Sequence, residues 1–437
     1  MLSGWIKYKF FNTIKFWIIV STLLLCPVSG QAVDAEFESM TIFRFMERTV
    51  REGTAEVSRN ISPVYEYFRL DAGDLLGTEQ NLSFHAYGWA RHDLAGAGFF
   101  QDDTEGELLY GYLQYRRPTA NFKLKIGRQP AFGFTFNDAI DGVLVSSDIL
   151  PFFSAKVYAG QSVSLASVNG RSGDFTAGGR MNFTLKNGYE TGFFYRYTAN
   201  ESLKDEEEAG FDLSIVLSNK FSILGRSEWN MITDGVNEHA YEVLITTENI
   251  TLRPFFNYFT YENLFAPEVN NASPFRFLVD SKEIITSLGI DSYYLLNETV
   301  SLGAKIVHYN YKIKNNTAQY ISGLAEWKYR PSSEIGFELG FMNSPGIDEG
   351  YILGRTYIYH TLTNKFLSAD VIYVRYEKGT RRKDYSFFAS AGAGTKLFKD
   401  RLEIKASLDY SSDPFFDNDF RGLISFTYKF PVLNNGE

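Results

Sequence analysis

The stretch GLISFTYKF, residues 422–430, decides the fold, because from Ile424 onward large apolar side chains alternate in it with polar ones without a break. The apolar set is Ile424, Phe426, Tyr428 and Phe430, and the polar set is Ser425, Thr427 and Lys429. A period of two indicates a β-strand with one apolar face. The aromatic residues gather toward the end of the stretch, as expected where a barrel strand crosses a membrane interface. We interpret it as the closing strand of a transmembrane β-barrel; an exposed strand of a soluble all-β domain is the alternative.

The same stretch resembles the C-terminal signal of bacterial outer-membrane proteins, in which the last strand alternates aromatic residues and ends on Phe. This chain departs from that pattern, since Pro431 to Glu437 follow. The resemblance implies insertion by the barrel assembly machinery into the bacterial outer membrane, with Phe426, Tyr428 and Phe430 as the assembly signal.

Residues 1–35 have the pattern of a signal peptide. Three lysines precede the apolar run Phe16 to Cys26, and Pro27 then leads to small residues ending at Ala32 or Ala35. A membrane anchor is the competing interpretation, but the apolar run is shorter than the roughly 20 residues that span a bilayer. We expect cleavage, with residues 36–437 forming one exported domain.

The composition excludes several classes of protein. The chain has 43 basic and 52 acidic side chains; without three leader lysines and Asp34 these become 40 and 51, a formal charge of −11, so nucleic acid is not an expected partner. Cys26 is the only cysteine, so the exported domain is expected to have no disulfide and no cysteine-bound haem or metal. After the leader, no apolar run reaches 18 residues, which excludes a bundle of membrane helices.

Short and long connections alternate along the second half of the chain, as they do in outer-membrane barrels, where the long ones lie outside the cell. The short turns lie around 186–188, 218–220, 248–249, 297–298, 331–333, 363–364 and 399–400. The longer polar segments are 200–210, 233–239, 261–282, 312–317, 343–350, 377–384 and 411–419. A soluble β-sandwich is not expected to have short and long connections in strict alternation.

The expected fold is therefore all-β, a transmembrane antiparallel β-barrel of about 22 strands (range about 16–22) with both termini in the periplasm. The first strand is expected near Thr41 to Val50. No segment as large as a plug domain precedes it in the sequence. Since 16 to 18 strands already leave an aqueous channel, we expect a wide lumen.

Where alternation is clean, the charged set is expected to face the lumen, because a Lys or Arg on the lipid face near the midplane costs about 2 to 4 kcal/mol. Lys123 and Lys125 oppose Phe122, Leu124 and Ile126. Arg180 opposes Met181, and Glu403 and Lys405 oppose Leu402 and Ile404. These charged residues are the predicted pore lining.

Gly127-Arg128-Gln129, followed by Asp141-Gly142, resembles a strand-loop-strand element of Gram-negative porin families. The resemblance implies that Arg128 and Asp141 lie near a constriction, with residues 132–137 folding inward. The alternative is an ion pair with a structural role at the base of the loop.

Catalysis has little support. The five histidines show no metal-ligand spacing, and the chain lacks a Gly-x-Ser-x-Gly elbow and phosphate-binding motifs, so no enzyme, metal or cofactor is expected. The acidic run Asp205 to Glu208 is expected in a solvated loop, with a bridge to lipopolysaccharide through divalent cations as the alternative.

Three functions fit these patterns. The first is a porin or porin-like channel for passive passage of ions and small solutes. The second is a structural sleeve, because the predicted wide barrel resembles the barrel component of porin-cytochrome conduits; that resemblance implies a multihaem cytochrome partner that supplies all the haem. The third is an adhesin or receptor that uses the segment Tyr261 to Lys282. Outer-membrane lipid and lipopolysaccharide are the expected surroundings in each case.

Overall fold

The structure is a computed structural model. It describes residues 35–52, 55–73, 75, 82–95, 100, 102–117, 119–132, 137–163, 175–185, 188–200, 203–264, 282–344, 350–377, 384–413 and 418–432. The predicted signal peptide lies outside the described residues except for Ala35, which is the first residue of a strand.

The described residues form one antiparallel sheet of 23 strands. The strands are β1 (Ala35–Glu52), β2 (Ala55–Ile61), β3 (Pro63–Ala72), β4 (Leu82–Asp93), β5 (Thr104–Arg117), β6 (Phe122–Phe132), β7 (Asn137–Leu150), β8 (Phe153–Val163), β9 (Phe175–Leu185), β10 (Tyr189–Asn200), β11 (Leu203–Ser218), β12 (Phe221–Asn230), β13 (Gly235–Thr246), β14 (Ile250–Thr260), β15 (Ile284–Leu295), β16 (Val300–Tyr311), β17 (Asn316–Arg330), β18 (Ser333–Asn343), β19 (Tyr351–Leu362), β20 (Lys365–Tyr376), β21 (Tyr385–Leu397), β22 (Leu402–Ser412) and β23 (Asp419–Val432). Two short helices, η1 (Thr119–Asn121) and α2 (Tyr261–Leu264), lie in connections.

β2 and β3 are two parts of one barrel strand. Both pair with the same edge of β1, and the register continues unchanged across Ser62, because Phe43 pairs with Val64 and Met46 with Ile61. Counting β2 and β3 together gives 22 strands around the barrel. The predicted number is confirmed.

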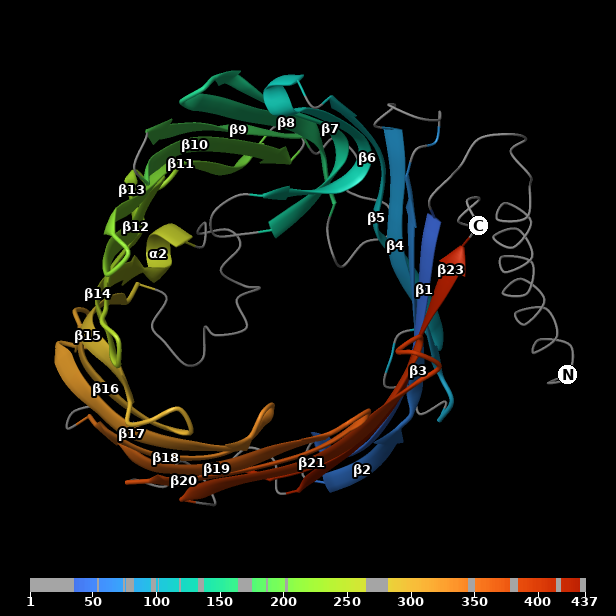
Figure 1. The fold of residues 1–437 in the computed structure, drawn as a ribbon, viewed down its shortest axis with the longest axis vertical. Coiled ribbons are helices and arrows are strands. Elements are labelled where there is room, and N and C mark those ends of the chain that lie inside the picture. Colours follow the sequence, from blue (N-terminus) through green and yellow to red (C-terminus); the bar gives the residue numbers. More distant parts are fainter. Residues whose placement is uncertain are drawn as a thin grey trace, which may run out of the picture.

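The sheet closes where β1 pairs with β23, from Ala35 opposite Val432 to Arg48 opposite Asp419. Figure 1 looks down the barrel and shows the strands as a ring in which the first and last strands lie side by side. Closure leaves no unpaired sheet edge, which is what a lipid environment requires of a β structure. The aromatic stretch 422–430 thus lies in the closing strand, as its pattern predicts.

The start of β1 and the end of β23 lie at the same end of the barrel, because Ala35 pairs with Val432. We call this end the turn end. The opposite end is the loop end. All seven short connections predicted in the second half of the chain lie at the turn end, because the antiparallel pairing alternates from strand to strand. The turn at Ser332, for example, joins β17 to β18 with a positive φ of 62°.

Two predicted long segments are wrong. Residues 203–210 belong to β11, and residues 235–239 belong to β13, so the connections before them are short. The cause is ladder pairing that continues toward the loop end: Arg196 of β10 pairs with Glu208 of β11 in the sheet register and by an ion pair of 2.8 Å. Arg196 is 3% exposed and Glu208 is 4% exposed. The whole acidic run 205–208 is therefore strand, and Arg196 pairs with two of its carboxylates, Glu208 and, at 3.0 Å, Glu206.

Candidate functional site: the lumen of the barrel

The two faces of the wall differ in chemistry. Large hydrophobic side chains stand exposed on one face, among them Leu288 at 62%, Leu185 at 58% and Leu408 at 57%. On the same strand as Leu408, the alternate residues Glu403 and Lys405 form an ion pair of 2.6 Å on the other face. The exposed hydrophobic face is the outside of the barrel, where lipid is the natural solvent, and the charged face is the lumen.

A basic side of the lumen wall is built by β6 to β9. Lys123 and Lys156 flank Ser146 in the sheet register, and Lys156 lies opposite Arg180 on the next strand. Lys125 lies on the same face, with its Nζ 4.4 Å from the centre of the Tyr112 ring. The structure therefore gathers the predicted residues Lys123, Lys125 and Arg180 on one side, while Glu403 and Lys405 lie on β22, elsewhere on the ring.

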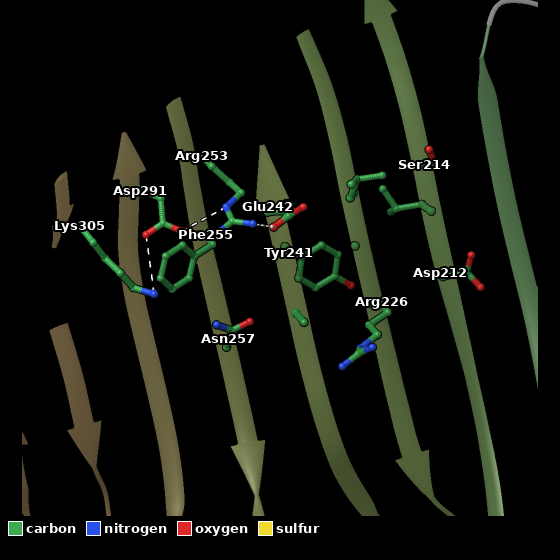
Figure 2. Close-up of a pocket in the computed structure, with 14 residues that line it drawn as sticks. Asp212, Ser214, Arg226, Tyr241, Glu242, Arg253, Phe255, Asn257, Asp291 and Lys305 are labelled. Atoms are coloured by element: carbon green, nitrogen blue, oxygen red, sulfur yellow. Dashed lines mark hydrogen bonds and ion pairs between the residues drawn. The ribbon is translucent and has the colours of Figure 1, made fainter. Parts of the chain in front are cut away.

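A mixed-charge side follows from β11 to β16. It surrounds a hollow of ≈ 510 Å³ in the wall (Figure 2). There Arg253 contacts Asp291 and lies 3.9 Å from Glu242, while Lys305 lies 3.7 Å from Asp291. Arg180 Nη2 reaches Asp212 Oδ1 at 2.8 Å and so joins the two sides.

Sequence reasoning did not single out this mixed-charge side, because its ion pairs join residues far apart in the chain. Arg253 and Asp291, for example, become neighbours only through the register of β14 and β15. The signal that was available is the alternation of Arg253 with Leu252 and Pro254. Exposed ion pairs contribute only about 0 to 1 kcal/mol to stability, so their main effect is on the electric field that a solute meets.

The wall bends inward at three glycines that lie side by side. Gly127 pairs with Gly142, and Gly142 pairs with Gly160. A Cβ on Gly142 would overlap the Ala159 carbonyl and lie 2.6 Å from Gly160 Cα. Gly127 also has a φ of 124°, which side chains rarely permit. In Figure 1 the ends of β6 and β7 turn into the ring, so this hairpin narrows the lumen.

Arg128 and Asp141 clamp the two strands just beyond the bend. Arg128 donates from Nε to Asp141 Oδ1 at 2.9 Å and from Nη2 to Oδ2 at 2.8 Å, while its Nη1 donates to the Leu108 carbonyl at 3.0 Å. A two-pronged pair of this kind fixes geometry strongly. By alternation the Arg128 and Asp141 side chains lie on the opposite face of the wall from Lys125. Their pairing holds together the two strands of the hairpin that narrows the lumen. Contact of these two residues with solutes stays a prediction.

A small core packs beside the bend on the lumen face of the wall. Ile140, Leu144 and Tyr158 pack together and are at most 8% exposed. The fully buried Gln129 donates to the carbonyl of Gly142 at 3.2 Å. This packing supports the bent hairpin from the lumen side.

The aromatic residues of the predicted assembly signal lie at the closing seam. Phe430 lies 5.5 Å from Phe37 of β1, Phe426 lies 6.3 Å from Phe43, and Tyr428 lies 4.3 Å from Phe430, measured between ring centres. Phe426 and Phe430 are exposed on the outer face, and Lys429 lies on the lumen face, 3.5 Å from Glu38. Their role in assembly stays a prediction.

None of the helices in the described part of the chain has the length and hydropathy to cross a bilayer. No group of three or more His, Cys, Asp or Glu side chains in that part of the chain has the arrangement of a metal site.

No protein-family model matches the sequence, and no curated protein does. Among solved structures, the siderophore receptor PirA from Pseudomonas aeruginosa is similar over 92% of this chain and 81% of its own, with 13% identity and a TM-score of 0.55. That likeness shows the fold. OpdQ from the same organism (10% identity, 92% and 98% coverage, TM-score 0.45) and OccAB2 from Acinetobacter baumannii (9%, 91% and 98%, 0.46) are more distant in shape. The conduit interpretation gains no support from these likenesses.

Proposed function

We propose that this protein is a porin-like channel of the bacterial outer membrane, through which ions and small solutes pass passively. The observation that supports it is the contrast between the two faces of a closed 22-strand barrel: exposed leucines outside, and the charged lumen residues of β6 to β16 inside. A barrel of this width encloses space for water and solutes. The wall residues act on solutes through charge and shape, with no bond chemistry.

In this proposal residues 1–35 are an export leader, and residues 36–437 are one barrel with both termini in the periplasm. The turn end then faces the periplasm and the loop end faces the cell exterior, as the usual length difference between connections implies. Lipid and lipopolysaccharide surround the outer face, and the barrel assembly machinery inserts the chain.

The basic side of the lumen is expected to set ion preference. Replacing both Lys123 and Lys125 with Glu should make the channel more selective for cations. The reversal potential, measured in a planar bilayer under a gradient of potassium chloride, should then move toward the equilibrium potential of potassium. The reason is that both lysines lie on the lumen face of β6, Lys125 two residues before Gly127, and a fixed charge on the pore wall attracts counter-ions.

The matched control carries the same charge change at the turn end, with Lys220 and Lys399 both replaced by Glu; both lie in connections. This control should move the reversal potential much less. Equal shifts from the two double variants would mean that Lys123 and Lys125 do not line the conducting path.

A structural sleeve, which no observation on this chain favours, would instead be isolated together with a multihaem cytochrome.

A further inference from the structure

We propose that the lumen wall of β3, β4 and β5 binds linear, uncharged oligosaccharides along a path of aromatic rings. The path, called here the aromatic track, consists of Tyr65, Tyr67, Tyr87, Trp89, Tyr110 and Tyr112. The inference rests on the proposed channel function and names a class of solute for it.

The aromatic track faces the lumen. Its members alternate along their strands with residues of the outer face, such as Leu113, which is 46% exposed. They share their own face with Lys125, which lies over the Tyr112 ring, and with Arg69 and Asp71. Aromatic residues are expected on the lipid side of a barrel, so a group of six on the polar side requires a different explanation.

The rings form a continuous line. Tyr65 lies 6.1 Å from Trp89 and 6.2 Å from Tyr67, and Tyr67 lies 6.2 Å from Tyr87. The line continues from Tyr87 to Tyr110 at 5.5 Å and from Tyr110 to Tyr112 at 5.7 Å. The interplanar angles lie between 21° and 51°, so the rings lie beside one another as a platform.

The line follows the pore. Tyr65 and Trp89 belong to the parts of β3 and β4 nearer the loop end, and Tyr112 belongs to the part of β5 nearer the turn end. The track therefore descends along the direction in which a solute crosses the barrel. A track across the direction of transport would hold a solute without guiding it.

Arg44 lies over the Tyr65 ring and Lys125 over the Tyr112 ring, near the two ends of the track, and the rings between them are available to a solute. All six are partly exposed. Within the described residues no hydrogen bond joins the hydroxyls of the five tyrosines to a protein group, while the Trp89 indole donates to the Glu107 carboxylate. Tyrosine hydroxyls that point into water can donate to and accept from a solute.

The polar groups beside the track carry balanced charge. Arg69 donates to Asp71 at 2.6 Å, and His85 lies 2.5 Å from the other oxygen of Asp71. Lys125 and Glu107 add one charge of each sign, and Arg44, 5.1 Å from the centre of the Tyr65 ring, and Glu38, opposite Arg69, add another of each. Balanced donors and acceptors favour a solute with many hydroxyls over a net anion or cation.

A sugar ring matches this surface. One face of a pyranose presents C–H groups that pack on an aromatic ring, and its edge presents hydroxyls that reach charged side chains. A linear oligosaccharide repeats this unit and so can contact successive rings of the track. A small aromatic acid would contact one ring and require an unbalanced cation beside it.

The test uses maltohexaose and cellohexaose on the purified full-length barrel. Added to one side of a planar bilayer, at least one of them should block the ion current at concentrations where glucose does not. Replacing Tyr67 and Tyr87 with Ala should raise the half-blocking concentration about tenfold, which corresponds to about 1.4 kcal/mol. Calorimetric titration of the same sugars into the detergent-solubilised barrel provides a second reading that needs no conductance.

Two controls isolate the track. The double Phe variant at Tyr67 and Tyr87 keeps the rings and should lose much less affinity than the double Ala variant. Tyr309→Ala removes a lumen tyrosine of β16, on the opposite wall (Figure 1), and should leave block unchanged. Gel mobility of unboiled samples verifies that each variant is folded.

The outcomes separate the two proposals. Calorimetric binding by a barrel that does not conduct would remove the channel and keep the aromatic track. A conducting barrel that neither sugar blocks or binds, or that binds sugar equally well in the double Ala variant, would overturn the aromatic track and keep the channel. Block by benzoate in preference to both sugars would also overturn it.

Discussion

Replacing Gly142 with Val is expected to straighten the inward bend of β6 and β7 and to enlarge the conducting path. A Cβ at this position would overlap the Ala159 carbonyl and crowd Gly160, and both contacts are with backbone that cannot turn aside. Overpacking of this kind costs about 1 to 3 kcal/mol if the bend is kept. The hairpin can relieve it by moving toward the wall, and single-channel conductance should then exceed that of the unmodified barrel.

Gly323→Val is the matched control, since a Cβ at Gly323 would meet no atom within 4 Å. It should conduct as the unmodified barrel does. A Gly142→Val barrel that folds and conducts no more than this control would mean that the bent hairpin does not limit the path.

The second large effect is expected at the closing seam. Phe430→Asp should sharply reduce the amount of folded barrel in the outer membrane. Phe430 is 43% exposed on the outer face and packs on Phe37 of β1, so the variant loses an apolar contact where the barrel closes and places a charge toward lipid. Loss of a large apolar side chain from its surroundings costs about 2 kcal/mol.

Lys429→Asp is the comparison on the same strand. Its side chain lies on the lumen face beside Glu38, where water and salt limit the repulsion to less than about 1 kcal/mol. The folded fraction, read from the mobility of unboiled samples, should remain near that of the unmodified protein. If the two variants fold in equal amounts, the outward role of Phe430 in assembly is refuted.

The sequence predicts the barrel well because a β-strand of this kind can be recognised from its own residues. The alternation in 422–430 and the turns near Asn249 and Asn364 are local patterns, and local patterns are sufficient to place strands and to assign their two faces. The acidic run 205–208 shows where this fails: its composition is typical of a loop, but the cation that neutralises Glu208 is Arg196 of the neighbouring strand.

Features that run across strands were the hardest to predict. The row of Gly127, Gly142 and Gly160 exists only through the register of β6, β7 and β8. The aromatic track likewise needs three strands in register, although the pairs Tyr65 with Tyr67 and Tyr110 with Tyr112 already show aromatic side chains two residues apart. One sequence without aligned relatives contains no direct record of which residues meet across strands.

We propose that the lumen is an open path for solutes. The most direct test is to purify the protein from native membranes, record its visible spectrum and then measure its current in a planar bilayer. We predict a colourless preparation that conducts steadily. A haem absorption band of stoichiometric intensity, in a preparation that conducts little until the haem protein is removed, would contradict the channel and establish the sleeve.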